Sequence, residues 1–444
     1  MKPGSFFIVC ATGLLAGPVA VAAEAASATP AIPAARAAAA FAEAHALCSA
    51  DNGRLWGHTL CVPLMFVDTA SREAVLNQPA KGAIEDSTVY RLALPPGIGI
   101  ANTSIDFQGK RWSMVVWPLP ADSVLRAILL MHESYHSIQP ALGLQGNGGL
   151  GKNGELDSRE GRIWMRAELA ALRAALLASG EQRERALADA LLFRAYRMSL
   201  WPHAQTDGQN LELNEGLAES TGIDATRHSV GARIAAAVHD IDSVQKDRSF
   251  VRSFAYATGP AYAELLDAVQ PDWRRKVTPE FAFDRTAAAA YHIPMPKPDR
   301  DRAMAAIMKY GGKQIIAQED ARAKVTATRN ARFTQALVDG PTLTLPLAKF
   351  PTISFDPRQV YSLPGHGSVY QTLTLGEAWG NLKVHGDGMA LIPSDFGSVT
   401  VPLDETPVGV QIVGNDWSLT LNKGYGFRPD RHRKGSFIVT RDKP

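Results

Sequence analysis

The spacing of apolar residues along the chain changes twice and divides the sequence into three regions. Between about residues 55 and 118, short apolar runs are separated by Gly, Pro and Asn, a pattern typical of strands joined by turns. From residue 121 to about 333, apolar residues recur every three or four positions, which indicates helices. Beyond residue 340 alternating runs return, with turn residues between them, as in an antiparallel sandwich.

These patterns predict the elements of each region. In the first region we expect strands at residues 60 to 68, 88 to 94 and 111 to 117. In the second we expect helices near residues 121 to 138, 156 to 179, 183 to 200, 211 to 224, 229 to 245, 260 to 269 and 313 to 333. In the third we expect strands at residues 342 to 347, 370 to 375, 408 to 413 and 417 to 421. The fold class is therefore α+β: a small N-terminal sheet (48 to 120), a mainly helical domain (121 to 334) and a C-terminal antiparallel β-sandwich-like domain (341 to 444).

The N-terminus has the order of a secretory signal peptide. Lys2 precedes an apolar run from residue 6 to 15, and small residues follow as far as Ala23, which predicts removal of residues 1 to 23. The alternative is a buried N-terminal helix. The run is too short to span a bilayer, so we expect an exported, periplasmic or secreted protein without a transmembrane anchor. Residues 24 to 47 are an Ala-rich leader that runs into a helix from about residue 34.

Removal of the signal peptide leaves two cysteines, Cys48 and Cys61. In an oxidising compartment such a pair is expected to form a disulfide; the alternative is two buried thiols. The 444 residues carry a formal net charge of +2, with Lys and Arg scattered along the chain. Because no basic stripe is present, we expect neither nucleic acid nor an anionic membrane as a partner.

Candidate chemistry is concentrated in the segment A-I-L-L-M-H-E-S-Y-H, residues 127 to 136. His132 and His136 stand four positions apart and project from one helix face, where two imidazoles can bind one zinc ion. Glu133 lies about 100° round the helix, within reach of a water molecule that zinc makes more acidic, and can act as general base. The alternative is a chance motif in which these side chains form a structural network.

A third ligand is required, and the segment L-E-L-N-E-G-L-A-E, residues 211 to 219, contains the best candidate. H-E-x-x-H followed by N-E-G-hydrophobic-A resembles the gluzincin class of zinc peptidases. That resemblance implies a zincin-like catalytic domain in which Glu215 is the third ligand and Glu219 orients a histidine. The two segments lie 79 positions apart (215 − 136), farther than is usual in that class, and the G-x-M-E-N segment of its aminopeptidases is absent.

Other residues compete for these roles. Glu168 is the alternative metal ligand, although it could equally be paired with Arg166 or Arg173; Asp224 and His228 are further candidates. For stabilising an oxyanion, residues 254 to 262 offer Tyr256 and Tyr262 beside a Gly-Pro break, and we nominate Tyr256. The alternative for both tyrosines is packing.

The sequence thus predicts a zinc-dependent hydrolase, in the first place a metallo-endopeptidase that acts on peptides or polypeptides. The strand at residues 111 to 117 leads into the metal helix and could offer its edge to extended substrate. Two alternatives remain: a zinc hydrolase of a non-peptide amide or ester, and a binding or scaffold protein with a vestigial or structural metal site. An open His-His-Glu set favours catalysis over a closed structural site. The oligomeric state is not predicted.

Overall fold

The computed structural model describes residues 30 to 95, 97 to 144, 153 to 202, 204 to 348, 352 to 356 and 359 to 442. The predicted signal peptide therefore lies outside the described residues. Helices and mixed sheets both occur, so the α+β class is confirmed. The chain forms two compact units, with the boundary between Ala323 and Lys324 inside the last helix; the sequence pattern set the division later, after residue 334.

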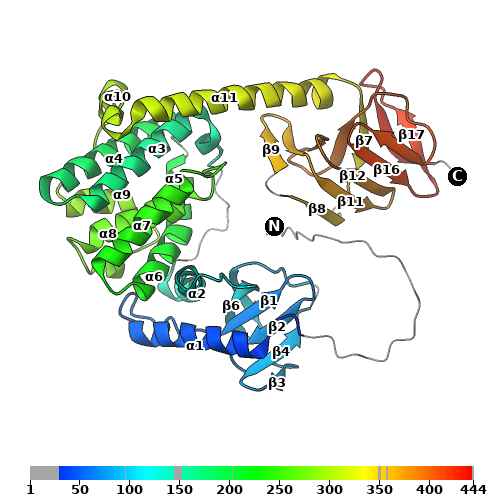
Figure 1. Cartoon of the computed structure of the whole chain (residues 1–444). Helices are drawn as coiled ribbons and strands as arrows, with labels where there is room; N and C mark the ends of the chain where they lie inside the picture. Colours follow the sequence, from blue (N-terminus) through cyan, green and yellow to red (C-terminus); the bar gives the residue numbers. More distant parts are fainter. Residues whose placement is uncertain are drawn as a thin grey trace. The chain divides into compact units, whose positions relative to one another are not determined.

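A six-stranded mixed sheet forms the N-terminal part of the first unit (Figure 1). Its strands are β1 (Leu64–Asp68), β2 (Glu73–Leu76), β3 (Ile84–Asp86), β4 (Val89–Ala93), β5 (Thr103–Phe107) and β6 (Lys110–Trp117), in the order β3-β4-β2-β1-β6-β5. The central strand β1 is buried on both faces, Phe66 toward the helices and Met65 toward a second apolar cluster. This two-sided burial explains its unbroken apolar run.

The expectation that β6 presents a free edge is wrong. β6 pairs in parallel with β1 on one side and antiparallel with β5 on the other. Both rows of its backbone groups are therefore used inside the sheet, and the edge on this side belongs to β5.

Helices make up most of the rest of the first unit; α11 crosses into the second unit, and η6 belongs to the second unit. The α-helices are α1 (Ala34–Asp51), α2 (Ser123–Ile138), α3 (Arg159–Leu177), α4 (Gly180–Leu200), α5 (Ala204–Leu211), α6 (Leu217–Thr226), α7 (Val230–Val244), α8 (Phe254–Asp267), α9 (Phe283–Ala290), α10 (Arg300–Ile307) and α11 (Gly312–Thr334). Short 3-10 helices are η1 (Gln139–Leu142), η2 (Gly154–Asp157), η4 (Trp273–Lys276) and η5 (Met308–Tyr310), and π-helical turns are η3 (Glu212–Gly216) and η6 (Gln335–Asp339). The pattern did not predict α9 and α10, which are only eight residues long.

Helix α2 begins at a capped N-terminus and lies between the sheet and the other helices (Figure 1). The Asp122 carboxylate accepts hydrogen bonds from the backbone N–H groups of Val124 and Leu125, which satisfies donors that a helix start leaves free. The helix packs against β6 on one side and against α6 on the other. α2 therefore reaches the region where the two predicted metal-binding segments meet.

Two sequence interpretations of this region are corrected. Gly259 and Pro260 do not break a helix: α8 begins at Phe254 and runs through them. Gly259 is needed because its backbone crosses that of Gly216, and a Cβ on Gly259 would lie 2.3 Å from the Gly216 Cα. The predicted helix at 211 to 224 is instead interrupted by the π-turn η3.

The second unit contains the C-terminal strands β7 (Thr342–Pro346), β8 (Thr352–Phe355), β9 (Val360–Leu363), β10 (Gly367–Tyr370), β11 (Leu373–Glu377), β12 (Gly380–Val384), β13 (Ala390–Ile392), β14 (Ser398–Pro402), β15 (Gln411–Gly414), β16 (Trp417–Leu421), β17 (Tyr425–Pro429) and β18 (Phe437–Arg441). They form a seven-stranded and a five-stranded sheet, mostly antiparallel. The predicted strand at 370 to 375 is in fact two strands, because the chain passes from one sheet to the other between Tyr370 and Leu373. Side chains from both sheets, such as Leu345 and Leu375, share one core.

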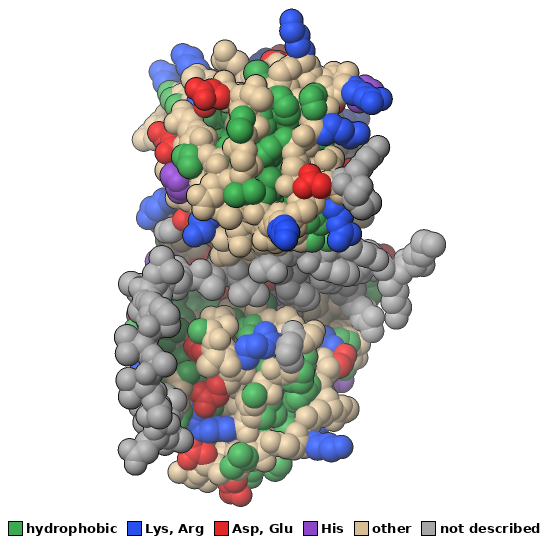
Figure 2. Space-filling model, turned by 90° about the vertical axis from the view of Figure 1, so that its right-hand side faces the viewer, with side chains coloured by type: hydrophobic (Ala, Val, Ile, Leu, Met, Phe, Trp, Pro, Cys, Tyr) green, Lys and Arg blue, Asp and Glu red, His purple; other side chains and the backbone are tan. Residues whose placement is uncertain are grey.

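Apolar side chains gather on one face of the second unit, in the upper part of Figure 2. Val408, Val410 and Val413 of this unit are all more than half exposed. None of the described helices has the length and apolar character that crossing a membrane requires.

Candidate metal centre

Helix α2 presents two imidazoles toward the same point. His132 and His136 stand one helical turn apart, and their Nε2 atoms lie 3.1 Å from each other. The rings are tilted by 70° with centroids 4.9 Å apart. Both side chains are largely buried, with 5% and 13% of their area exposed. If neither Nε2 atom carries a proton, the two lone pairs face each other at this distance, and a metal ion bound between them would relieve the repulsion.

Glu215 arrives at the same point from the π-turn η3. Its Oε2 lies 3.4 Å from the Nε2 of His132 and 3.6 Å from the Nε2 of His136. Zinc bonds of 2.0–2.1 Å at a tetrahedral angle set ligand atoms about 3.3–3.4 Å apart. The three observed separations bracket this value, so the two nitrogens and the oxygen fit one zinc ion with a fourth position left open.

The other nitrogen of each ring has an acceptor. The Nδ1 of His132 lies 2.8 Å from Glu219 Oε2, and the Nδ1 of His136 lies 3.1 Å from Gln139 Oε1. When the proton sits on Nδ1 and is donated to such an acceptor, Nε2 keeps its lone pair free for a metal. The hydrogen bond at Nδ1 also makes Nε2 more basic and orients the ring. Glu219 therefore takes the position expected of it. Gln139 was not predicted, although its position three residues after His136 is a usable signal.

The carboxylates make the centre strongly favourable for positive charge. Burial lowers the pKa of His132, but hydrogen bonds to Glu215 and Glu219 outweigh burial and raise it to about 10. Burial raises the pKa of Glu215, yet the hydrogen bonds to His132 and His136 outweigh it and hold that pKa far below its usual range. The same anionic surroundings would stabilise a divalent cation, and its binding would displace the proton from His132.

Glu133 is buried beside the histidines, with 3% of its area exposed. Its Oε2 has no hydrogen-bond partner among the described residues. Burial raises the pKa of this carboxyl, while the neighbouring His132 and His136 lower it by a smaller amount. A buried carboxylate with an unused oxygen is well suited to take a proton from a water molecule placed next to it.

Tyr256, on the first turn of α8, contacts two members of the centre. Its hydroxyl donates to Glu215 Oε2 at 2.6 Å, and its ring stacks on His132 with centroids 5.6 Å apart and planes 3° from parallel. Asn214, which the sequence analysis missed, donates from Nδ2 to Glu215 Oε1 at 3.0 Å. Each oxygen of Glu215 thus has its own neutral donor, which orients the carboxylate.

The alternative ligand Glu168 does not join this centre. It is completely buried, and Arg194 and Arg197 donate to its two oxygens at 2.6 and 2.9 Å. The Tyr262 hydroxyl also donates to Glu168 Oε1, at 3.2 Å. Both oxygens are therefore used by buried cations, and no part of Glu168 can contact substrate. Its expected partners are occupied elsewhere: Arg166 pairs with Glu319 and Arg173 with Asp242.

Asp224 and His228 do not join this centre either. Asp224 pairs with Arg233 and Arg274, and His228 belongs to none of the groups of potential ligands found among the described residues. Tyr262 is fully buried beside Glu168, so packing and hydrogen bonding account for it. Of the two tyrosines considered, Tyr256 alone contacts the centre.

A buried ion network holds the π-turn that carries Glu215. Arg194 donates from both terminal nitrogens to Glu212, at 2.5 and 3.0 Å, and Thr258 Oγ1 donates to the same carboxylate at 2.6 Å. Arg194 also bonds Glu168, so one guanidinium ties η3 to α3. Fully paired buried charges of this kind fix geometry, because breaking any one pair leaves a charge without compensation. π-Turns of this sort recur at functional sites.

No protein-family model, curated protein or solved structure matches this chain.

Proposed function

We propose that this protein is a zinc-dependent hydrolase and, in the first place, a metallo-endopeptidase of the gluzincin type. The observation that supports this most directly is the convergence of His132, His136 and Glu215, with ligand atoms 3.1 to 3.6 Å apart. Glu133 lies beside them with an unpaired oxygen. Three ligands with an open fourth position are typical of catalytic rather than structural zinc sites.

In this proposal each side chain has a separate task. When bound, zinc supplies a Lewis acid that polarises the scissile carbonyl and increases the acidity of water. The Glu133 carboxylate accepts one proton as the water oxygen attacks the carbonyl carbon, and it returns that proton to the amine that leaves when the C–N bond breaks. Tyr256, whose hydroxyl bonds Glu215 in the structure, can turn to donate to the carbonyl oxygen as negative charge develops there.

The sheet edge next to the metal centre could pair with a polypeptide substrate in an extended conformation. β5 is the terminal strand on its side of the sheet and contacts α2. Ser104 of β5 donates from Oγ to the backbone oxygen of His136 at 3.2 Å, which ties the edge to the metal helix. An extended segment that pairs with β5 would therefore run close to the two histidines. We propose β5, in place of β6, as the substrate-facing strand.

The test measures metal content and hydrolysis in the same samples. Purified protein should bind about one zinc and cleave an unfolded generic polypeptide, and His136→Ala should lose the metal. Glu133→Gln should keep zinc and fold but lose hydrolysis by roughly 10²- to 10⁴-fold, since the amide cannot accept the proton. Glu181→Gln, at a side chain that is 80% exposed, is the matched control and should behave as wild type.

The outcomes separate the alternatives. Absence of bound divalent metal in the wild type would refute the whole proposal. Zinc binding with equal hydrolysis by wild type and Glu133→Gln would refute the assigned general base. Zinc binding without hydrolysis of polypeptides, but with Glu133-dependent hydrolysis of simple amides or esters, would move the substrate class from peptides to small molecules.

A further inference from the structure

Trp56 contacts α2, which carries His132 and His136, and α6, which carries Glu219. Its indole Nε1 donates to Thr221 Oγ1 at 3.0 Å, and its ring centroid lies 5.1 Å from that of Tyr135. Thr221 belongs to α6, two residues after Glu219, and Tyr135 belongs to α2, directly before His136. Trp56 is 8% exposed. One buried side chain thus contacts both helices next to residues of the metal centre.

The hydrogen bond from Trp56 is specific. Thr221 Oγ1 donates its own proton to the backbone oxygen of Leu217 at 2.6 Å, so a lone pair of the hydroxyl is directed to Trp56. The indole N–H is a buried donor that would cost free energy if it lost its acceptor. A further ring, that of Trp273, lies edge-on at 6.5 Å and restricts the indole on another side. Trp56 therefore has one defined position.

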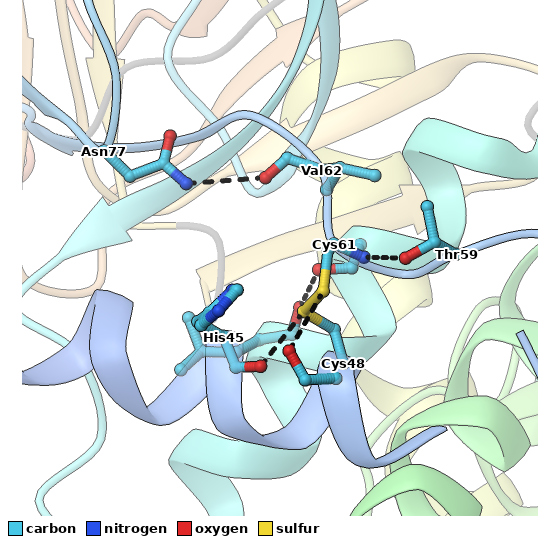
Figure 3. The surroundings of a disulfide bond; sticks show 9 residues. His45, Cys48, Thr59, Cys61, Val62 and Asn77 are labelled. Atoms are coloured by element: carbon cyan, nitrogen blue, oxygen red, sulfur yellow. Dashed lines mark hydrogen bonds between the residues drawn. A yellow bond between two sulfur atoms is a disulfide. The ribbon is translucent and has the colours of Figure 1, made fainter. Parts of the chain in front are cut away.

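That position depends on a loop closed by the Cys48 to Cys61 disulfide (Figure 3). Cys48 is in α1, Cys61 precedes β1, and Trp56 lies in the segment between them. Leu55 and Leu60 of this loop are also buried in the core of the first unit, and the Leu55 N–H donates to Asp51 Oδ1 at 3.3 Å. Closing a loop removes many of the conformations in which Trp56 would lie away from the helices.

The disulfide can be reached from solvent. A cavity of about 220 Å³ is lined by Cys48, Cys61 and His45, and Cys61 is exposed. A ring nitrogen of His45 and both sulfurs lie within 4.8 Å of one another, so the imidazole lines the opening beside the disulfide. Exposed disulfides are open to attack by thiolates.

We propose that Trp56 is a positioning residue of the metal centre and that the disulfide holds it there, so that metal affinity depends on the oxidation state of Cys48 and Cys61. This inference rests on the proposed zinc site. A dithiol reductant would act by forming and then resolving a mixed disulfide: its two thiols become a disulfide, and Cys48 and Cys61 each gain one electron and one proton. Release of the loop would let α2 and α6 shift relative to each other.

The experiment compares zinc affinities, by chelator competition, in proteins whose fold is checked by circular dichroism. Trp56→Phe keeps the ring but removes the N–H donor, with the disulfide intact. Trp112→Phe is the matched control, because Trp112 is a buried tryptophan whose Nε1 donates to the Phe107 backbone oxygen at 3.2 Å within the sheet. We expect Trp56→Phe to lower zinc affinity about 10- to 100-fold, as loss of other supports of a metal site does, and Trp112→Phe to keep it.

Wild type is also reduced with a dithiol, alkylated at Cys48 and Cys61, and freed of reductant before titration with zinc. A loss of affinity similar to that of Trp56→Phe supports the inference. Cys48→Ala/Cys61→Ala should show the same loss without any reductant. If reduction or the double substitution unfolds the protein, affinity is lost with the fold and a specific dependence on the disulfide is refuted, whereas Trp56→Phe still decides the positioning role.

The failures are distinguishable. Wild-type zinc affinity in Trp56→Phe, or equal losses in Trp56→Phe and Trp112→Phe, would overturn the positioning role. Wild-type affinity in the reduced, folded protein would overturn the dependence on the disulfide. Oxidised wild type that binds no zinc would instead refute the function on which the inference rests.

Discussion

The contact between α2 and α6 offers a sharp test of how the centre is assembled, through the substitution Gly222→Ala. Gly222 of α6 lies against Ile128 of α2, and a Cβ added there would be 2.7 Å from the Ile128 backbone oxygen and 2.9 Å from its Cγ2. The first of these atoms belongs to the helix backbone and cannot rotate away. The added methyl can fit only if the two helices separate.

The separation follows from the distances. Ordinary contact of a Cβ begins at 3.4 Å, so α6 must move by about 0.7 Å (3.4 − 2.7) relative to α2. Glu215 lies in the turn that leads directly into α6, whereas His132 is on α2. Metal–ligand distances vary by only about ±0.2 Å. We therefore expect Gly222→Ala to lower zinc affinity about 10- to 100-fold and stability by about 1–3 kcal/mol.

Zinc affinity is measured by chelator competition and stability by urea unfolding of the metal-free protein. Gly231→Ala is the control, since Gly231 is an exposed helical glycine of α7 with nothing within 4 Å of an added Cβ. It should bind zinc as wild type does and gain up to about 1 kcal/mol of stability. Unchanged zinc affinity in Gly222→Ala would refute the reasoning that the α2–α6 spacing sets the metal geometry.

Two further substitutions test the assignment of the acidic residues. Glu219→Ala should lower zinc affinity about 10- to 100-fold. Glu168→Ala should keep zinc while the protein is folded but lose about 3–5 kcal/mol of stability, because it leaves the buried Arg197 without a carboxylate partner and removes one of the two carboxylates that pair with Arg194. The reverse pattern in zinc titration and urea unfolding would restore Glu168 as the ligand. Burial, together with the charge of Glu219, raises the pKa of Asp240 from 3.8 to about 8, so the folded metal-free protein holds a proton that the unfolded chain releases. That contribution to stability is fully present below about pH 3.8, falls as the pH rises, and is lost once the pH has passed through 8. The stability of Asp240→Asn relative to wild type should therefore increase with rising pH, by at most about 1.4 kcal/mol per pH unit. A difference in stability that stays constant between pH 5 and 9 would contradict the raised pKa.

Features that depend on residues close together in the chain could be predicted from the sequence. The four-residue spacing of His132 and His136 places both on one helix face in any α-helix, and the structure has them there. The pairing of Cys48 with Cys61 followed from their being the two cysteines that remain beyond the predicted signal segment, and the disulfide confirms it. The α+β class followed from the change between helical and alternating periodicity, which reports local burial.

Features that depend on distant residues were decided by the tertiary structure. Glu168 and Glu215 both lie among apolar residues, and the difference between them is that Arg194 and Arg197 pack against the first, whereas the second faces two imidazoles. Periodicity shows that a side chain is buried but not which group from another helix meets it.

The same reason explains the errors about backbone elements. The sequence of β6 is that of a strand, but whether a strand is central or at an edge depends on which strands pair with it, here β1 and β5. Gly259 and Pro260 have the composition of a break, yet the chain stays helical because the missing side chain lets Gly259 pack against Gly216, 43 residues earlier (259 − 216). Local sequence thus determined which side chains can bind metal, and the packing of α2, η3 and α6 decided which of them meet.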